Sequence, residues 1–276
     1  RANGLEPMFA IGDRKLTLEP SLKETDAVGL ERHEYKFLDQ DGNDVGFLEL
    51  YPDEAKKQLY IGMIGGKAGL YSNSFGPSLI RDLKRQLKEL YPEAIFPPVY
   101  FVIGTMSSGG TSSDDGLIIG AEMYGMTAET PKEELNDWLL TVLKPVEEVP
   151  HIVAHELIHF QQTYDGGTLL QACLKEGSAD FIAELISGKH INGHVHDFAN
   201  PKEKELWLEF QDRMFEKNYD GWLYSPSPGR PNDLGYWMGY KITRAYYDKA
   251  KDKQQAIRDI LTIKDEKKFL KDSGYE

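Results

Sequence analysis

Cysteine is nearly absent from this sequence, and long apolar runs are absent too. The single cysteine, Cys173, excludes an intramolecular disulfide and any zinc ribbon built from several cysteines. No apolar run approaches the roughly 18 residues that a helix needs to cross a bilayer. The richest stretch, residues 94–103, is short and contains Pro97 and Pro98. A disulfide framework is therefore excluded, and no transmembrane segment is expected.

Basic residues are outnumbered by acidic ones. The 276 residues include 32 Lys and Arg against 45 Asp and Glu, which gives a formal net charge of −13. Such a surface does not attract phosphate groups through bulk charge, so binding to nucleic acid or to anionic lipid is not expected. Hydrophobic residues make up 40% of the chain. At this length that is enough for a large buried core, in one domain with two lobes or in two domains.

The two parts of the chain differ in their predicted secondary structure. Residues 1–125 contain short apolar runs typical of strands, with one helix predicted at 77–90; the predicted strands are 47–51, 59–64, 99–103 and 117–122. Strands followed by helices, and not alternating with them, indicate the α+β class. We therefore predict a strand-rich N-terminal lobe at residues 1–125 and a helical lobe at residues 126–276.

Residues suited to the first and last positions of helices predict several helices in the second lobe. Pro131 stands where a first helical residue is expected, and Thr168 and Gly188 are suited to the two ends of another helix. The predicted helices after Pro131 are 151–164, 169–187, 201–219 and 234–249. His190, His194 and His196 fall in a predicted loop. They are interpreted either as solvated side chains or as ligands of a second ion.

The sequence His155-Glu156-Leu157-Ile158-His159 is an HExxH motif on one of these helices. Side chains four residues apart lie on the same helix face, so both imidazoles are able to bind one zinc ion. Glu156 follows the first ligand and is suited to take a proton from a zinc-activated water. The alternative is a surface helix with two solvated histidines.

A zinc site needs a third protein ligand, and Glu176 is the predicted one. A turn at Gly166 and Gly167 would allow a second helix to return and present Glu176 to the metal. Asp180 lies one turn further on the same face, where it would accept a hydrogen bond from His155 and orient that ring. Gly177 in mid-helix would permit close approach of another helix. The alternative is two solvated carboxylates on a helix face.

These motifs resemble known families. HExxH followed by Glu-x-x-x-Asp resembles the gluzincins, the thermolysin-like clan of zinc peptidases. Residues 176–181, together with Gly235-Tyr-x-x-Gly-Tyr240, are more closely similar to a bacterial family of predicted zinc-dependent proteases, itself distantly similar to gliding-motility lipoproteins. The resemblance covers about residues 95–250. It implies a zincin-like fold with an active-site cleft between the two lobes, a catalytic zinc, and hydrolysis of peptide or protein substrates.

The resemblance also implies the remaining parts of an active site. In the clan a Tyr or His stabilises the oxyanion, and we assign Tyr236 to that role, with Tyr240 next; the alternative is two core aromatics. In zincins an edge strand pairs with extended substrate. Residues 118–122 are the best-placed strand, so Ile119, Gly120 and Ala121 are the expected substrate-binding residues.

Two other functions remain open from sequence. The chain could be a non-enzymatic zincin-scaffold module of a cell-surface or motility assembly, or a zinc hydrolase acting on a non-peptide amide or ester. The intact HExxH motif and Glu176 favour hydrolysis of peptides. The resemblance implies an exported or lipid-anchored protein, with a cytoplasmic location left open. The chain begins with Arg1 and not with methionine, so one interpretation is that a signal or anchor segment preceded it.

Overall fold

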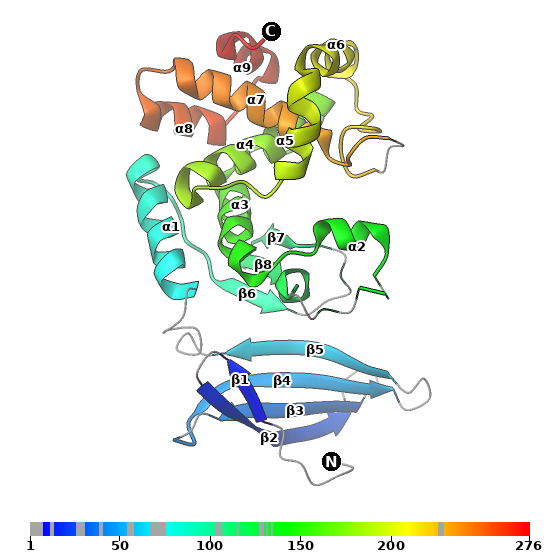
Figure 1. Ribbon diagram of the computed structural model, residues 1–276. Helices are drawn as coiled ribbons and strands as arrows, with labels where there is room; N and C mark the ends of the chain where they lie inside the picture. The colour runs from blue at the N-terminus through cyan, green and yellow to red at the C-terminus, as the bar shows by residue number, and fades with distance from the viewer. Residues whose placement is uncertain are drawn as a thin grey trace. The chain divides into compact units, whose positions relative to one another are not determined.

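A computed structural model shows an α+β protein, as the sequence predicted (Figure 1). The structure describes residues 8–11, 14–25, 31–38, 41–53, 58–66, 76–102, 106, 108–114, 116–126, 130, 132–133, 135–225 and 229–276. Among these residues the strands precede most of the helices along the chain.

The first sheet is a five-stranded antiparallel meander in which each strand pairs with the next one in sequence. The predicted strands at 47–51 and 59–64 lie within two of its members, and the others were not predicted. The strands are β1 (Met8–Ile11), β2 (Arg14–Thr25), β3 (Glu31–Leu38), β4 (Asp44–Asp53) and β5 (Gln58–Gly66). Gly42, between β3 and β4, has a φ of +80°, a conformation that favours glycine.

The second sheet shows that the strand expected to bind substrate is not at an edge. It contains β6 (Val99–Val102), β7 (Gly110–Ser113) and β8 (Gly116–Gly120), in the order β6-β8-β7. The predicted edge strand is β8, which lies between two neighbours, and Gly120 N–H already donates to the Gly109 carbonyl at 3.1 Å. Ala121 begins the 3₁₀ helix η1 (Ala121–Tyr124). The edge-strand prediction is therefore wrong, because no open side of β8 is left for a peptide.

The helices follow their predicted positions with local differences. Pro131, where a helix was expected to begin, lies outside the described residues, and the next helix begins at Asp137 with Asn136 as its cap. The predicted loop around His196 contains a helix. The α-helices are α1 (Gly76–Leu90), α2 (Asp137–Val142), α3 (Val149–Gln161), α4 (Leu169–Ser187), α5 (Gly193–Ala199), α6 (Glu203–Arg213), α7 (Leu234–Lys249), α8 (Lys253–Leu261) and α9 (Glu266–Ser273). The 3₁₀ helices η2 (Val146–Glu148) and η3 (Asn200–Lys202) precede α3 and α6.

Helix α4 is the element on which the site depends, and its ends confirm the prediction. Thr168 forms a capping box with Gln171, and Gly188 ends the helix with a φ of +81°. Helix α4 packs against both α3 and α7. A Cβ added at Gly177 would lie 2.1 Å from the Tyr240 backbone nitrogen, and one at Gly239 would lie 1.7 Å from the Cys173 carbonyl oxygen. Only glycine permits this approach, as the sequence predicted for Gly177.

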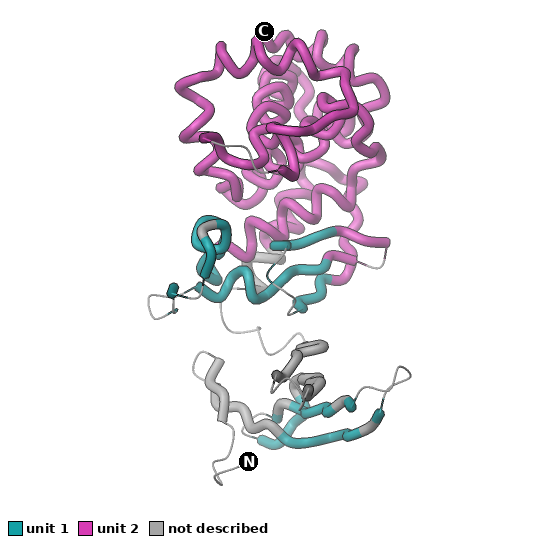
Figure 2. Tube along the Cα trace, turned by 90° about the vertical axis from the view of Figure 1, so that its right-hand side faces the viewer, with its two compact units in different colours: residues 1–81, 99–111, 118–147 teal, residues 82–98, 112–117, 148–276 magenta. Residues whose placement is uncertain are grey.

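Two compact units divide the chain, and they alternate along it (Figure 2). Unit 1 comprises residues 1–81, 99–111 and 118–147, and unit 2 comprises residues 82–98, 112–117 and 148–276. The predicted boundary at residue 125 treats each lobe as continuous, whereas two short segments before it belong to unit 2. Helices α3 to α9 lie in unit 2. No helix in the described parts of the chain is long and apolar enough to cross a membrane.

Candidate metal centre

Helix α3 places the two histidines of the HExxH motif side by side. The helix begins with Pro150 in its first turn, and apolar residues such as Ile152 and Ile158 bury one side of it. His155 and His159 are four residues apart, so their rings lie on one face, with centroids 4.6 Å apart. Their Nε2 atoms are 2.9 Å apart.

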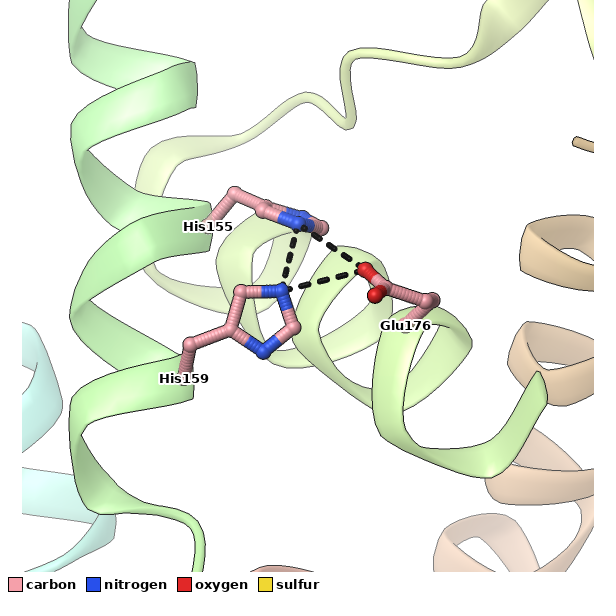
Figure 3. A group of neighbouring side chains, drawn as sticks. All are labelled: His155, His159 and Glu176. Atoms are coloured by element: carbon pink, nitrogen blue, oxygen red, sulfur yellow. Dashed lines mark hydrogen bonds and ion pairs between the residues drawn. The ribbon is translucent and has the colours of Figure 1, made fainter. Parts of the chain in front are cut away.

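Glu176 reaches the same point from α4 (Figure 3). Its Oε2 atom lies 3.1 Å from Nε2 of His159 and 3.7 Å from Nε2 of His155. The predicted third ligand is therefore beside the first two, on a neighbouring helix. Among the described residues, these three form the one group of at least three His, Cys, Asp or Glu side chains with candidate ligand atoms all within 4.8 Å.

The three atoms fit a zinc ion. Zinc bound tetrahedrally at about 2.0–2.1 Å separates its ligand atoms by about 3.3 Å. The separations here, 2.9, 3.1 and 3.7 Å, lie around that value. Two imidazole nitrogens and a carboxylate oxygen that face one another repel unless a proton or a cation lies among them. The donor set therefore suits a divalent metal, and two nitrogens with one oxygen suit zinc.

Asp180 orients His155, as the sequence predicted. Its Oδ1 accepts a hydrogen bond from Nδ1 of His155 at 2.8 Å, and its Oδ2 accepts one from Nδ2 of Asn192 at 2.7 Å. Because an ionised carboxylate only accepts, the ring proton is on Nδ1. Nε2 of His155 is thereby directed to the centre. Asn192 had no signal in the sequence, since it lies outside the motifs, just before α5.

Gln162 orients the ring of His159, as Asp180 orients that of His155. Its Oε1 accepts from Nδ1 of His159 at 2.7 Å. Its Nε2 donates to the Lys175 carbonyl at 2.7 Å and to Oγ of Ser178 at 2.9 Å, which fixes the orientation of the amide. Sequence reasoning missed Gln162, although its place three residues after His159, at the end of α3, was a usable signal.

Neighbouring charges at the centre raise the pKa of His155 and lower the pKa of Glu176. Burial alone lowers the pKa of His155, but hydrogen bonds to Asp180 and Glu176 outweigh it and raise that pKa well above its usual value. Burial alone raises the pKa of Glu176, but His159 and His155 hold it well below the usual range. Glu176 is therefore ionised, which is the state that binds a metal.

Glu156 is the second residue of the motif and is buried, with 5% of its surface exposed. Burial raises the pKa of its carboxyl group, and the nearby His155 and His159 oppose that rise. A carboxyl group with a raised pKa beside a metal centre is suited to accept a proton near neutral pH. Its role as a base stays a prediction.

The two predicted tyrosines lie in different places. The ring of Tyr236 is stacked on that of His155, with centroids 5.9 Å apart and an interplanar angle of 19°. The hydroxyl of Tyr240 donates to Glu184, which lies eight residues beyond Glu176 and so about 12 Å further along α4. The structure brings the ring of Tyr236 to the centre, whereas the hydroxyl of Tyr240 is held by Glu184 about two turns further along α4.

Another tyrosine contacts the centre without having been predicted. The hydroxyl of Tyr224 donates to Oε1 of Glu176 at 2.5 Å. Tyr224 stands at the start of a Ser, Pro and Gly segment and belongs to no motif. Nothing in the local sequence distinguishes it from the chain's other tyrosines.

The remaining histidines are not ligands of this centre. Nδ1 of His151 is 2.9 Å from Oγ of Ser187. The rings of His190 and His196 are tilted by 30° to each other with centroids 4.1 Å apart, and both contact the Tyr240 ring. His196 is buried, and burial lowers its pKa to about 4. Two members of the predicted cluster, His190 and His196, are thus in ring contact, and His194 is exposed on α5.

A comparison with protein families decides where the chain belongs. The model of the family described as gliding motility protein GldB matches residues 77–276, which include every residue of the candidate metal centre. The chain belongs to the GldB family. No curated protein and no solved structure matches it. The sequence analysis placed gliding-motility proteins only as distant relatives of the protease family that the chain resembles, and the match shows that the chain itself belongs with them. The gluzincin resemblance receives no support from the comparisons.

Proposed function

We propose that this GldB-family protein is a zinc-dependent hydrolase that cleaves peptide bonds. The observation that supports the proposal is the convergence of three ligand atoms, from His155, His159 and Glu176, within 4.8 Å of one another. Two of these residues belong to an HExxH motif, and the first is oriented by a buried carboxylate, Asp180. This is the arrangement that the gluzincin resemblance implies, so a zincin-like fold of unit 2 is part of the proposal.

Each residue of the proposed site has one role in the reaction. Zinc held at this centre would polarise the substrate carbonyl and lower the pKa of a water molecule toward about 7. Glu156 would take the proton of the attacking water at its carboxylate and pass it to the leaving amine. Tyr236, stacked on His155, is the proposed donor to the developing oxyanion.

A second candidate is a non-enzymatic module of a cell-surface or motility assembly. The family description, gliding motility protein GldB, supports this candidate better than it supports hydrolysis. The family's short name, GldB_lipo, also favours an envelope lipoprotein. In that case the metal would have a structural role. A zinc hydrolase of non-peptide amides or esters is the third candidate, and a substrate panel would separate it from the first.

Substituting Glu156→Gln tests the proposed hydrolysis. The amide keeps the shape of the carboxylate but cannot accept the proton, so we expect retained zinc and a rate lower by about 10²–10⁴. The measurement is cleavage of a peptide library by the zinc-loaded protein, together with its metal content. Glu205→Gln is the matched control, because Glu205 is exposed on α6.

Two outcomes would count against hydrolysis. Equal cleavage by Glu156→Gln and by the wild type would show that Glu156 is not the base. A zinc-loaded wild type that cleaves no peptide and no ester would favour the module of a motility assembly.

A further inference from the structure

We propose that Tyr224 is a positioning residue of the metal centre, one that restrains Glu176 to a single ligating oxygen and slows release of the metal. The inference rests on the proposed metal centre and extends it to a residue outside every motif. It does not depend on whether the centre is catalytic.

The hydrogen bonds of Glu176 are divided between its two oxygens. Oε1 accepts from the hydroxyl of Tyr224 at 2.5 Å, while Oε2 lies 3.1 Å from Nε2 of His159. A carboxylate with one oxygen engaged in this way offers the other oxygen to a metal. The Tyr224 contact therefore selects binding through one oxygen over binding through both.

The Tyr224 backbone is held in a conformation that bulky residues seldom adopt. Its φ is +60°, and its N–H donates to Oδ1 of Asp233 at 2.9 Å. Asp233 itself has a φ of +65° and immediately precedes α7. Strained backbone persists where the surroundings enforce it, and here the enforced conformation presents the tyrosine to Glu176.

The Tyr224 side chain extends from solvent to the buried carboxylate. Tyr224 is 61% exposed, whereas Glu176, which its hydroxyl contacts, is 8% exposed. The ring therefore lies on the solvent side of Glu176. Because a leaving metal must break its bond to Glu176, a carboxylate that is fixed in place should release it more slowly.

Substituting Tyr224→Phe removes the hydroxyl and keeps the ring. The zinc-loaded protein is mixed with an excess of a colorimetric chelator, and zinc release is followed with time. We expect release about 10–100-fold faster than from the wild type, the usual effect of losing a hydrogen bond to a metal ligand. Tyr275→Phe is the matched control, because its hydroxyl also donates to a carboxylate, Glu203, at 2.9 Å, and Glu203 is no ligand.

Cobalt(II) in place of zinc gives a second measurement that does not involve activity. Release of Oε1 would let Glu176 bind through both oxygens and raise the coordination number. The visible absorption of cobalt should then be weaker in Tyr224→Phe than in the wild type and unchanged in Tyr275→Phe.

Several results would overturn the inference. Zinc release equal to that of the wild type would do so, as would an unchanged cobalt spectrum. A metal-free Tyr224→Phe protein that unfolds at clearly lower denaturant concentration than the metal-free wild type would assign the hydroxyl to fold stability instead. A wild-type protein that takes up no metal would overturn both this inference and the proposed function, so the two failures are distinguishable.

Discussion

Each imidazole of the centre is hydrogen-bonded through Nδ1 and directs Nε2 inward. Asp180 accepts from His155, and Gln162 accepts from His159. Such contacts fix the tautomer and the ring orientation before a metal arrives, and so reduce the ordering that binding requires. The two partners differ in chemistry, since Asp180 offers a carboxyl group and Gln162 offers a neutral amide.

Substituting Asp180→Asn tests the orienting role. The asparagine amide replaces one of the two acceptor oxygens with an NH₂ group, so either His155 or Asn192 would face a donor instead of an acceptor. We expect zinc affinity about 10–100-fold lower, measured by competition with a chelator. The control is Asp197→Asn, since Asp197 is exposed on α5. Equal affinity of Asp180→Asn and wild type would contradict the role.

The ligands were predictable from sequence and several of their partners were not. Helical spacing alone relates His155 to His159, and Glu176 to Asp180, so a motif reveals them. Asn192 and Tyr224 reach the centre from segments outside α3 and α4. Asn192 follows α4 and Tyr224 precedes α7, so their positions depend on the path of the connecting segments. No local sequence pattern predicts that path.

At the scale of elements, the close backbone contact between α4 and α7 fixes the position of the helix that carries Glu176. The Gly239 position touches the backbone at Cys173, three residues before Glu176. An added methyl group would have to displace a main-chain carbonyl and not a flexible side chain. The contact therefore requires glycine, even though glycine is a poor helix former.

Substituting Gly239→Ala should separate these helices. Its Cβ would lie 1.7 Å from the Cys173 carbonyl oxygen, so we expect the free energy of unfolding to fall by about 3 kcal/mol or more. Gly193→Ala is the control, because a Cβ there meets nothing within 4 Å, and its effect should stay within about 0.5 kcal/mol. Urea unfolding monitored by circular dichroism measures both. A Gly239→Ala protein as stable as Gly193→Ala would contradict the packing described.

The strands show where sequence patterns fail at this scale. Strand β2 was missed because it is rich in charged residues and contains Pro20, beside which its register with β3 shifts. Short apolar runs revealed β4 and β5. Strand β8 was recognised as a strand, but its central place in the sheet depends on pairing with β6 and β7. Pairing between strands is non-local, so the edge could not be identified from one segment.

At the scale of the molecule, the family match covers the helices that carry the candidate centre and leaves out the five-stranded sheet. The match begins at residue 77, after the last strand of the five-stranded sheet, and includes all of α3 to α9. The candidate metal centre thus lies in the part of the chain that matches the family. The N-terminal sheet lies outside the match, and its role is not indicated by any motif.

Metal content is the most direct test of the proposed centre. After loading with zinc and gel filtration, elemental analysis should find about one zinc ion per chain in the wild type. His155→Ala should contain almost none, because two ligands hold zinc weakly. His194→Ala should retain it, because His194 is exposed on α5 and is not one of the three grouped residues. A wild type without zinc, or a His155→Ala protein with as much zinc as the wild type, would contradict the metal centre.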